Sequence, residues 1–318
     1  MEKGNTKKIV FKLPPYKQYV IGSLEEAKQK AGWGITAFNL PDTWKLTQGE
    51  GVKIAVLDTG CDLDHPDLIN NLLPGANFIN CGAPPEDDNS HGSHCAGIIC
   101  AENNDIGMVG VAPKAKIMPV KVLDKHGSGD LVAVTAGIKW ALANGADIIA
   151  MSLGCPAPVA QVRAACQLAN QAGVPVFCAA GNAGKTKDVF YPACYPETIA
   201  IGAIDESFSR SSFSNTGVNL DFMAPGSNIF STIPDNWYGV MSGTSMACPF
   251  AVGVAALLLS YVRNHKTNIT LKSVDDYRNA LKAKTIPIKD LDINNKKFFE
   301  GFGILDPKDI IEWAETVK

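Results

Sequence analysis

The strongest constraint on the fold is an alternation of short apolar runs and helix-like segments that begins near Gly51. The runs are rich in β-branched residues and end in turns, as in VKIAVLDTG, KIMPVKVL and VPVFCAAGN. Helical segments lie between them, such as LVAVTAGIKWALANG, which ends at Gly145. Runs of this kind suit strands that are buried on both faces of a parallel sheet. The sequence therefore predicts an α/β fold, a three-layer sandwich with a mostly parallel, doubly wound sheet.

Four polar residues fall where such a fold places its chemistry. Ligands bind at the carboxyl ends of the strands in open α/β sheets. Asp58 and Asn182 each end a predicted strand, and His91 and Ser245 each lie at the start of a predicted helix. One fold can therefore bring the four to one rim. They supply the orienting group, oxyanion donor, base and nucleophile that acyl transfer needs.

Three sequence blocks resemble the signature blocks of the subtilisin family of serine proteases. They are VLDTG around Asp58, HGSHCAG around His91 and GTSMACP around Ser245, in the chain order that the family uses. The resemblance runs from about residue 33 to residue 262. It implies a subtilisin-like fold and an endopeptidase with broad sequence tolerance. Ser245 would attack the scissile carbonyl, His91 would transfer the proton and Asp58 would hold the imidazole.

The resemblance also implies that two further residues would help to stabilise the negative charge of the oxyanion. Asn182 resembles the side-chain oxyanion donor of the family. Thr244 is expected to cap the helix that begins at Ser245. The cap would direct backbone N–H groups and the positive end of the helix at the developing negative charge.

Substrate binding is also implied by the resemblance. Two backbone edges would hold a peptide as an added strand, with main-chain hydrogen bonds giving affinity. The edges are Gly127, Ser128 and Gly129, and Ser152, Leu153 and Gly154. Gly154, Ala179 and Ala180 would line a pocket for an apolar side chain at P1, the substrate residue before the cut, and Phe190 falls where it would partly close that pocket. A second apolar subsite or ordinary core packing would suit Leu123, Leu131 and Val134.

A calcium site is expected because one loop looks like the calcium loop of the family. Side-chain and carbonyl oxygens would converge there from the loop, from the HPDL segment and from the N-terminal region. The expected ligands are Gln29, Asp67, Glu102, Asn104, Ile106 and Met108. Hard oxygen atoms suit Ca²⁺, and the ion would stabilise the loop rather than take part in the chemistry. A solvated Asn-rich turn is the alternative.

Residues 1–30 are expected to be separate from the peptidase domain, residues 31–318. They are rich in lysine and end in SLEEAKQKAG, a helix candidate, and they lack the apolar stretch of a secretory signal. One element resembles the Leu-x-Pro-Tyr element of intracellular subtilisins: Leu13, Pro14, Pro15 and Tyr16. Because neither proline can donate a backbone hydrogen bond, we expect the segment to lie distorted across the cleft as a tethered inhibitor. A disordered tail is the alternative.

The net charge and the cysteine content indicate which partners and which cellular compartment to expect. The net charge of −3 on 318 residues gives no reason to expect nucleic acid or an anionic membrane as a partner. Nine cysteines, an odd number at irregular spacing, argue against a disulfide framework and, with no signal, favour the cytoplasm. The expected partners are protein or peptide substrates and the chain's own extension. The resemblance also allows a homodimer, which composition does not decide.

Two other functions compete with a protease. A catalytically silent peptide-binding relative would lack part of the catalytic set, which is complete here. An esterase of the α/β-hydrolase class needs a G-x-S-x-G elbow and a serine before the histidine, and neither is present. A zinc site at His94 and Cys95 lacks a second ligand pair, so a packed histidine is expected there. Cys248, close to the nucleophile, is expected to be an inert packed thiol.

Overall fold

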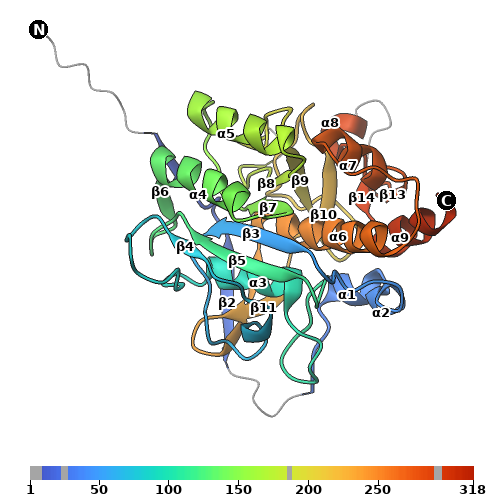
Figure 1. Ribbon diagram of the computed structural model, residues 1–318, viewed down its shortest axis with the longest axis horizontal. Coiled ribbons are helices and arrows are strands. Elements are labelled where there is room, and N and C mark those ends of the chain that lie inside the picture. Colours follow the sequence, from blue (N-terminus) through green and yellow to red (C-terminus); the bar gives the residue numbers. More distant parts are fainter. Residues whose placement is uncertain (1–8, 23–27, 185–187, 290–295) are drawn as a thin grey trace, which may run out of the picture.

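A nine-stranded sheet forms the centre of the computed structural model, which describes residues 9–22, 28–184, 188–289 and 296–318. Its strands are β3 (Lys53–Asp58), β4 (Ala76–Asn77), β5 (Lys116–Lys121), β7 (Ile148–Met151), β8 (Val176–Ala179), β9 (Ile199–Ile204), β10 (Phe222–Pro225), β13 (Thr285–Ile286) and β14 (Ile304–Leu305). The spatial order is β13-β14-β10-β9-β8-β7-β3-β5-β4. Every neighbouring pair is parallel except β13 with β14 (Figure 1). The predicted, mostly parallel α/β sheet is confirmed.

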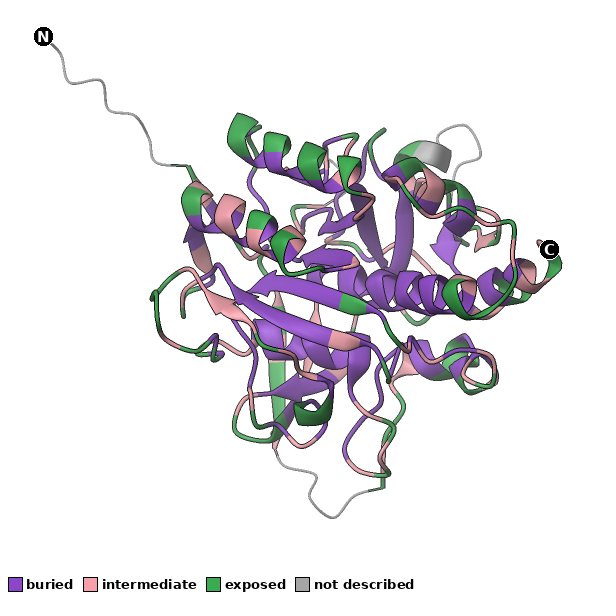
Figure 2. Ribbon diagram, in the orientation of Figure 1, coloured by how far each residue is buried: buried purple, intermediate pink, exposed green. Residues whose placement is uncertain are grey.

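Helices cover both faces of this sheet. On one face lie α3 (His91–Cys100) and α6 (Thr244–Asn264), and on the other lie α4 (Leu131–Ala143) and α5 (Ala160–Gln171) (Figure 1). Figure 2 shows α6 buried along most of its length, whereas α4 and α5 keep exposed outer faces. By length and composition α6 could cross a membrane, but 94% of its most apolar window is buried inside the protein. It is the core helix that its apolar sequence requires.

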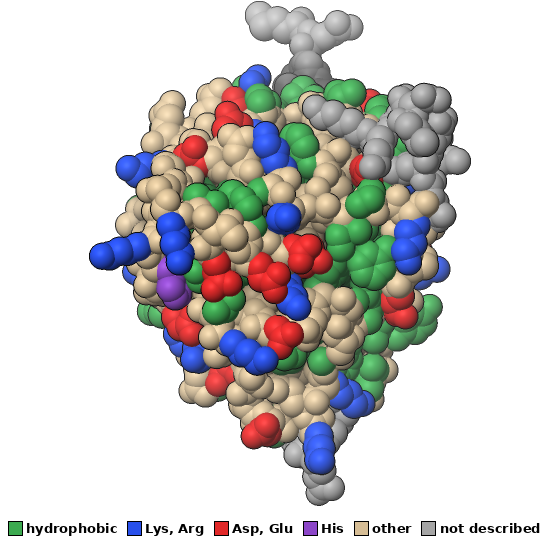
Figure 3. Space-filling view, turned by 90° about the vertical axis from the view of Figure 1, so that its right-hand side faces the viewer, with side chains coloured by type: hydrophobic (Ala, Val, Ile, Leu, Met, Phe, Trp, Pro, Cys, Tyr) green, Lys and Arg blue, Asp and Glu red, His purple; other side chains and the backbone are tan. Residues whose placement is uncertain are grey.

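Shorter helices complete the described chain. They are α1 (Trp33–Ala37), α2 (Leu40–Thr43), a 3₁₀ turn (Ile69–Asn71), α7 (Val274–Leu281), α8 (Lys296–Glu300) and α9 (Pro307–Thr316). Figure 3 shows positive and negative side chains interspersed on the face that carries α2 and α9. On this face Lys308 Nζ lies 3.7 Å from Asp42 Oδ2 and 3.7 Å from Glu312 Oε1. This face therefore presents mixed charge rather than one sign.

Local signals explain where the helices begin and end. The carboxylate of Asp130 accepts hydrogen bonds from the backbone of Val132 and Ala133, which caps the first turn of α4. Gly145 and Gly173, just beyond α4 and α5, have φ values of +73° and +75°. This left-handed conformation costs glycine little and ends a helix readily. The end of α4 agrees with the sequence prediction at Gly145.

The N-terminal extension contributes two strands that the sequence did not predict. β1 (Val10–Lys12) pairs antiparallel with β6 (Ser128–Asp130). β2 (Lys17–Gly22) is an edge of a three-stranded antiparallel sheet with β12 (Trp237–Ser242) and β11 (Ile229–Ile233). Residues 1–8 of the predicted extension and 23–27 of its helix candidate lie outside the described residues. The described end of that candidate is not helical, because Lys28 and Lys30 form β-bridges with Ile106 and Met108.

Candidate active site

Asp58 and His91 form a buried, hydrogen-bonded pair at the carboxyl edge of the sheet. Asp58 is the last residue of β3, and His91 is the first residue of α3. His91 Nδ1 lies 2.8 Å from Asp58 Oδ1, and both side chains are fully buried. The backbone N–H of Thr59 donates to the same carboxylate oxygen at 2.8 Å. A carboxylate at Nδ1 favours the tautomer with its proton there, which leaves Nε2 free to accept one.

A second buried carboxylate, Asp87, connects the loop after Asp58 to the start of α3. It accepts hydrogen bonds from Thr59 Oγ1 at 2.8 Å and from Ser93 Oγ at 2.6 Å. Thr59 Oγ1 in turn accepts the backbone N–H of Gly92 at 2.9 Å. These bonds fix the distance between Asp58 and His91. Asp87 was not predicted from the sequence, although the acidic run EDD directly before the NSHG block was the available signal.

Ser245 lies in the first turn of α6, close to the end of β7. Its hydroxyl donates to the carbonyl oxygen of Ser152 at 3.3 Å, and the Ser152 hydroxyl donates to the Ser245 carbonyl oxygen at 2.9 Å. Within the described part of the chain, His91 Nε2 has no hydrogen-bond partner. The hydrogen bond between nucleophile and base is therefore not formed in this conformation. Such bonds often form only when substrate binds.

Asn182 is oriented by Thr244, which corrects the expected role of Thr244 as a helix cap. The N-cap residue of α6 is Gly243, and no side chain caps the helix. The hydroxyl and backbone N–H of Thr244 instead donate to Asn182 Oδ1, at 2.7 and 2.8 Å. Because both donors use the amide oxygen, Asn182 directs its Nδ2 group outward. That group donates to the carbonyl oxygen of Pro15 at 2.8 Å.

The extension lies between the two expected substrate edges. Phe11 pairs with Gly129 of β6, and its side chain is fully buried. Lys12 exchanges two backbone hydrogen bonds with Gly154, at 3.0 and 3.1 Å. The N–H of Leu13 donates to the Gly127 carbonyl oxygen at 3.0 Å. The chain's own residues thus pair with both edges. The predicted apolar subsite residues belong to the same apolar cluster as the phenylalanine: Leu123, Leu131 and Val134.

Tyr16 lies over the catalytic histidine. Its ring centroid is 5.1 Å from that of His91, and its hydroxyl donates to Asn89 Oδ1 at 3.2 Å. Burial, together with the charges of Asp58 and Asp87, raises the pKa of Tyr16 to about 12. The phenol therefore stays protonated and acts as a donor. With Pro15 at Asn182 and Tyr16 at His91, the extension contacts both the oxyanion donor and the base.

Comparison with known proteins identifies the family to which this site belongs. Residues 49–303 match the model of the Subtilase family. The chain belongs to the subtilase family. It is 40% identical to "Intracellular serine protease" of Paenibacillus polymyxa over 90% of this chain and 88% of that protein. It is 44% identical to "Major intracellular serine protease" of Bacillus subtilis over 72% of this chain and 75% of that protein.

A relative that is called a subtilisin gives the same result. The chain is 46% identical to "Subtilisin E" of Bacillus subtilis over 74% of its own length, and the match spans 62% of that protein. The protein is therefore a serine endopeptidase of the subtilisin type. The expected protease activity is confirmed, and the esterase alternative is excluded.

The geometry shows how this subtilase can hydrolyse a peptide bond. In the mechanism that this arrangement permits, Ser245 would attack the carbonyl carbon, and its proton would pass to His91 Nε2, whose imidazolium form Asp58 would stabilise. Asn182 Nδ2 and the positive end of α6 would stabilise the charge on the carbonyl oxygen. His91 would then return the proton to the leaving amine. Water would repeat the sequence on the acyl-enzyme and release the acid.

We expect Asn182→Ala to lower the turnover number of the active protease by about 10²–10³, a magnitude that comes from subtilisin itself. The lost amide stabilises the oxyanion and contributes little to ground-state binding, so KM should stay nearly constant. Steady-state kinetics on a peptide substrate measure both constants. Asn219→Ala, which changes an exposed asparagine whose side chain contacts Cys194, is the matched control. A large rise in KM with unchanged turnover would contradict this role.

His94 and Cys95, which lie close to the triad, are electrically neutral. Burial and the neighbouring His91 lower the pKa of His94 to about 3, and its Nε2 lies 3.0 Å from the carbonyl oxygen of Ile229. Ligand atoms of Cys95, His91 and Asp58 lie within 4.8 Å of one another. Burial, however, raises the pKa of the Cys95 thiol well above its ordinary value, and metal ions bind thiolates. The cluster is therefore better explained as a triad with a packed cysteine beside it.

Most of the cysteines are buried, as expected of cysteines that pack as small apolar residues. All nine lie in the described residues, all are free, and seven are buried. Burial raises the pKa of Cys248, which follows the nucleophile in α6, to about 12. A protonated, buried thiol is unreactive.

Several predicted calcium ligands converge on the side-chain amide of Gln29. Its Nε2 lies 2.6 Å from the Glu102 carbonyl oxygen, 2.9 Å from that of Met108 and 3.3 Å from Asn104 Oδ1. Asp67 is fully buried beside them, and its carboxylate accepts from Asn104 Nδ2 and from the Met108 N–H. The loop pairs with the extension, since the Gln29 N–H donates to the Asp105 carbonyl oxygen. Rotating the Gln29 amide would add a further oxygen, so the donor set fits Ca²⁺.

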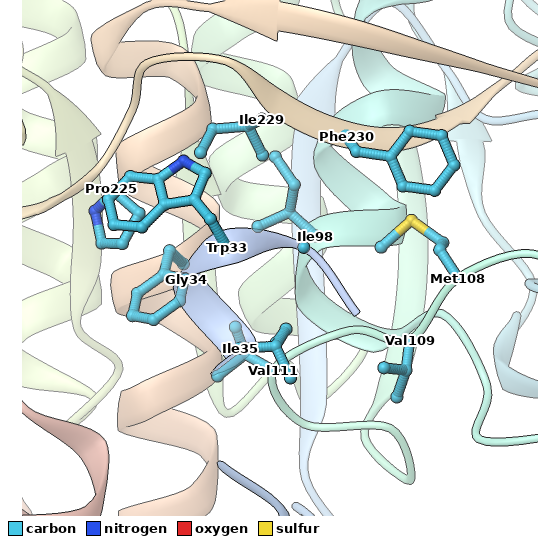
Figure 4. A pocket seen from close by; sticks show the side chains of 12 residues that line it. Trp33, Gly34, Ile35, Ile98, Met108, Val109, Val111, Pro225, Ile229 and Phe230 are labelled. Carbon is cyan, nitrogen blue, oxygen red and sulfur yellow. The ribbon is translucent and has the colours of Figure 1, made fainter. Parts of the chain in front are cut away.

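A separate apolar pocket lies at the start of α1. Figure 4 shows Trp33, Pro225, Ile98, Met108 and Phe230 around it, and none of its lining residues belongs to the triad. Its volume is about 30 Å³, room for no more than one or two water molecules. We attribute it to imperfect packing between α1 and residues 108–111.

Proposed function

We propose that this subtilase is a broad-specificity endopeptidase of the cytoplasm that is made as a precursor, restrained by residues 1–30. The observation that carries the proposal is the hydrogen bond from Asn182, the oxyanion donor, to the carbonyl oxygen of Pro15. A substrate carbonyl must accept that same bond in the transition state. While Pro15 holds it, no other peptide can be cleaved.

The contacts around Pro15 explain how the extension can be held without being cut. β1 pairs on one side of the cleft and β2 pairs with β12 on the other, so the chain is fixed at both ends. Pro14 and Pro15 between them have no N–H to donate, so the strand pairing is interrupted beside the triad. Ser245 Oγ donates to the Ser152 carbonyl oxygen, and His91 Nε2 has no partner in the described chain. The nucleophile is therefore not activated.

Broad specificity follows from the way the cleft holds a peptide. The extension is bound mainly by backbone hydrogen bonds to Gly127 and Gly154, and these bonds are available to any sequence. The wall residues Ala179 and Ala180 are small, buried and uncharged, which favours an apolar residue at P1. A charged P1 side chain would lose its hydration there without gaining a partner.

The experiment that tests the proposal follows cleavage and processing together. The intact chain is mixed with calcium and a panel of peptides, and mass spectrometry records peptide products and the N-terminus of the protease over time. We expect a slow initial rate that increases as an N-terminus near residues 20–30 appears. A constant rate from the moment of mixing, with the original N-terminus intact, would show that the extension does not restrain the enzyme.

Calcium is part of the proposal as a structural ion. Gln29, Asp67, Asn104 and the carbonyls of Glu102, Ile106 and Met108 would hold it, and it would fix the loop and the segment after the extension. At free Ca²⁺ about 100-fold above Kd, binding stabilises the fold by about 2.7 kcal/mol. We therefore expect chelation to lower Tm by about 4 °C. Calorimetry on the inactive Ser245→Ala variant avoids self-digestion during this measurement.

Matched variants of the loop separate calcium binding from general loop damage. Asn104→Ala should abolish most of the calcium-dependent increase in Tm, because the Asn104 side-chain oxygen points at the site. Asn103→Ala changes an exposed neighbour and should leave the increase intact. An identical Tm with calcium and with chelator would refute the site.

The names of two relatives support the cytoplasmic location. Both are called intracellular, and both are at least 40% identical to this chain. The free, mostly buried cysteines are also typical of a reducing compartment. The homodimer stays a prediction, which sedimentation of the Ser245→Ala variant would test.

A further inference from the structure

The carboxylate of Asp87 accepts five hydrogen bonds in a buried position beside the triad. Its Oδ1 atom accepts from Thr59 Oγ1 at 2.8 Å and from the N–H groups of Asn89 and Ser90, at 3.0 and 3.1 Å. Its Oδ2 atom accepts from the N–H and the hydroxyl of Ser93, at 2.9 and 2.6 Å. Every partner is a donor, which suits a carboxylate that carries its negative charge.

Thr59 connects this carboxylate to both members of the catalytic pair. Its N–H donates to Asp58 Oδ1, the oxygen that also faces His91 Nδ1. Its hydroxyl donates to Asp87 and accepts the N–H of Gly92, the residue after His91. A hydroxyl has one hydrogen to donate, so the acceptor at Asp87 sets the direction of that group. The carboxylate therefore acts on the histidine through the threonine and through the first turn of α3.

The negative charge of Asp87 also reaches the groups around the histidine. Burial and the charges of Asp58 and Asp87 raise the pKa of Tyr16, whose ring centroid lies 5.1 Å from that of His91. Burial and Asp58, with a smaller contribution from Asp87, raise the pKa of the Cys95 thiol, 3.7 Å from His91 Nδ1. A negative charge in this position favours the imidazolium form of the histidine, which the transition state contains.

The other charges around Asp87 do not cancel its effect. Lys121 Nζ lies 2.5 Å from Asp88 Oδ1, and this ion pair has no net charge. Among the residues that the structure describes, Asp87 forms no ion pair of its own, so only hydrogen-bond donors compensate its charge. Burial raises the pKa of two nearby acids, Asp62 (to about 6) and Glu86, which makes both easier to neutralise.

We propose that Asp87 is a positioning residue of the peptidase reaction and acts in two ways. Through Thr59 it holds the start of α3, so that His91 keeps its distance from Asp58. Its charge stabilises the imidazolium that forms when Ser245 attacks the substrate. The proposal concerns the peptidase activity itself and does not depend on restraint by the extension.

Asp87→Asn tests the charge, because it removes the charge with little change of shape. We expect kcat to fall by about 10–100-fold with KM nearly constant, since the imidazolium forms only along the reaction. The midpoint of the acidic limb of kcat/KM against pH should move to lower pH by about 0.5–1 unit. Without the negative charge the base takes up a proton less readily, so it stays neutral at lower pH. A purely structural role would leave this midpoint in place.

Variants of Thr59 test the connection separately from the charge. Thr59→Val removes the hydroxyl and keeps Asp87, so kcat should fall by about 10-fold while the acidic limb stays in place. Thr59→Ser retains the hydroxyl and should keep most of the wild-type kcat.

Asp205→Asn is the matched control. Asp205 Oδ1 likewise accepts one hydroxyl and two N–H donors, from Ser207 and Ser209, in a turn after β9 that contains no triad residue. This variant should leave kcat and the pH profile unchanged.

All rates are measured on the full chain after incubation with calcium until the peptide rate is constant, and circular dichroism checks the fold. A folded Asp87→Asn variant with the wild-type acidic limb would overturn the proposal. If Asp87→Asn does not fold, the Thr59 variants decide, and equal kcat values for Thr59→Val and Thr59→Ser would overturn it. A rate that is constant from the moment of mixing would contradict restraint by the extension and leave the comparison of these variants intact.

Discussion

Ser245→Ala is expected to lower peptide cleavage by about 10⁶-fold while the fold persists, a magnitude known from removing the same serine in subtilisin. The variant loses the nucleophile, so no acyl-enzyme forms, and only binding and oxyanion stabilisation remain. The structural loss is small, because the Ser245 hydroxyl makes one long hydrogen bond, 3.3 Å to the Ser152 carbonyl oxygen. A peptide assay measures the rate, and circular dichroism with Tm measures the fold.

Ser260→Ala provides the matched control for this variant. Ser260 belongs to the same helix, is buried, and donates to the Glu50 carbonyl oxygen at 2.9 Å. Its replacement should cost about 1 kcal/mol of stability and leave the peptide rate unchanged. Peptide cleavage by Ser245→Ala at more than a hundredth of the wild-type rate would refute the assignment of the nucleophile.

Phe11→Ala in the full chain is expected to increase the initial rate of peptide cleavage by about 100-fold or more. Truncating a fully buried phenylalanine costs about 3–5 kcal/mol, and each 1.4 kcal/mol is about a factor of 10 in an equilibrium constant. Phe11 belongs to a strand that can leave the cleft without unfolding the central sheet, so this cost should fall mainly on docking of the extension. The rate of the processed enzyme is the upper limit of the increase.

Lys12→Ala tests whether the effect depends on the buried side chain. Lys12 is exposed, and its contacts with Gly154 are made by the backbone, which alanine retains. It should leave the initial rate nearly unchanged. Both rates must be taken before processing, with the intact N-terminus verified by mass spectrometry. An unchanged rate in folded Phe11→Ala would contradict restraint through this anchor.

The central sheet and the triad could be predicted because their signals are local. A strand such as Lys53–Asp58 has its apolar pattern within six residues, and the polar residue that ends it is adjacent. The helix starts at His91 and near Ser245 are marked by short polar segments before apolar ones. Parallel strands align their carboxyl ends, so the meeting of these residues follows from the order of elements.

The roles of Thr244 and Asp87 could not be predicted, because each depends on a partner distant in the chain. Thr244 is a plausible helix cap by sequence, but Asn182, 62 residues away, offers its hydroxyl a better acceptor. Asp87 lies within the acidic run Glu86–Asp88, which could equally be a solvated turn.

The α/β order of elements and the candidate catalytic residues Asp58, His91, Asn182 and Ser245 could be read from the sequence alone, because periodicity and short motifs are properties of neighbouring residues. The pairing of β1 with β6, more than 100 residues away, and the position of Pro15 at Asn182 became visible only in the folded protein. Backbone hydrogen bonds between distant segments depend on where the folded chain brings two edges together. No local sequence pattern predicts which two edges will pair, although this pairing decides which peptide occupies the cleft.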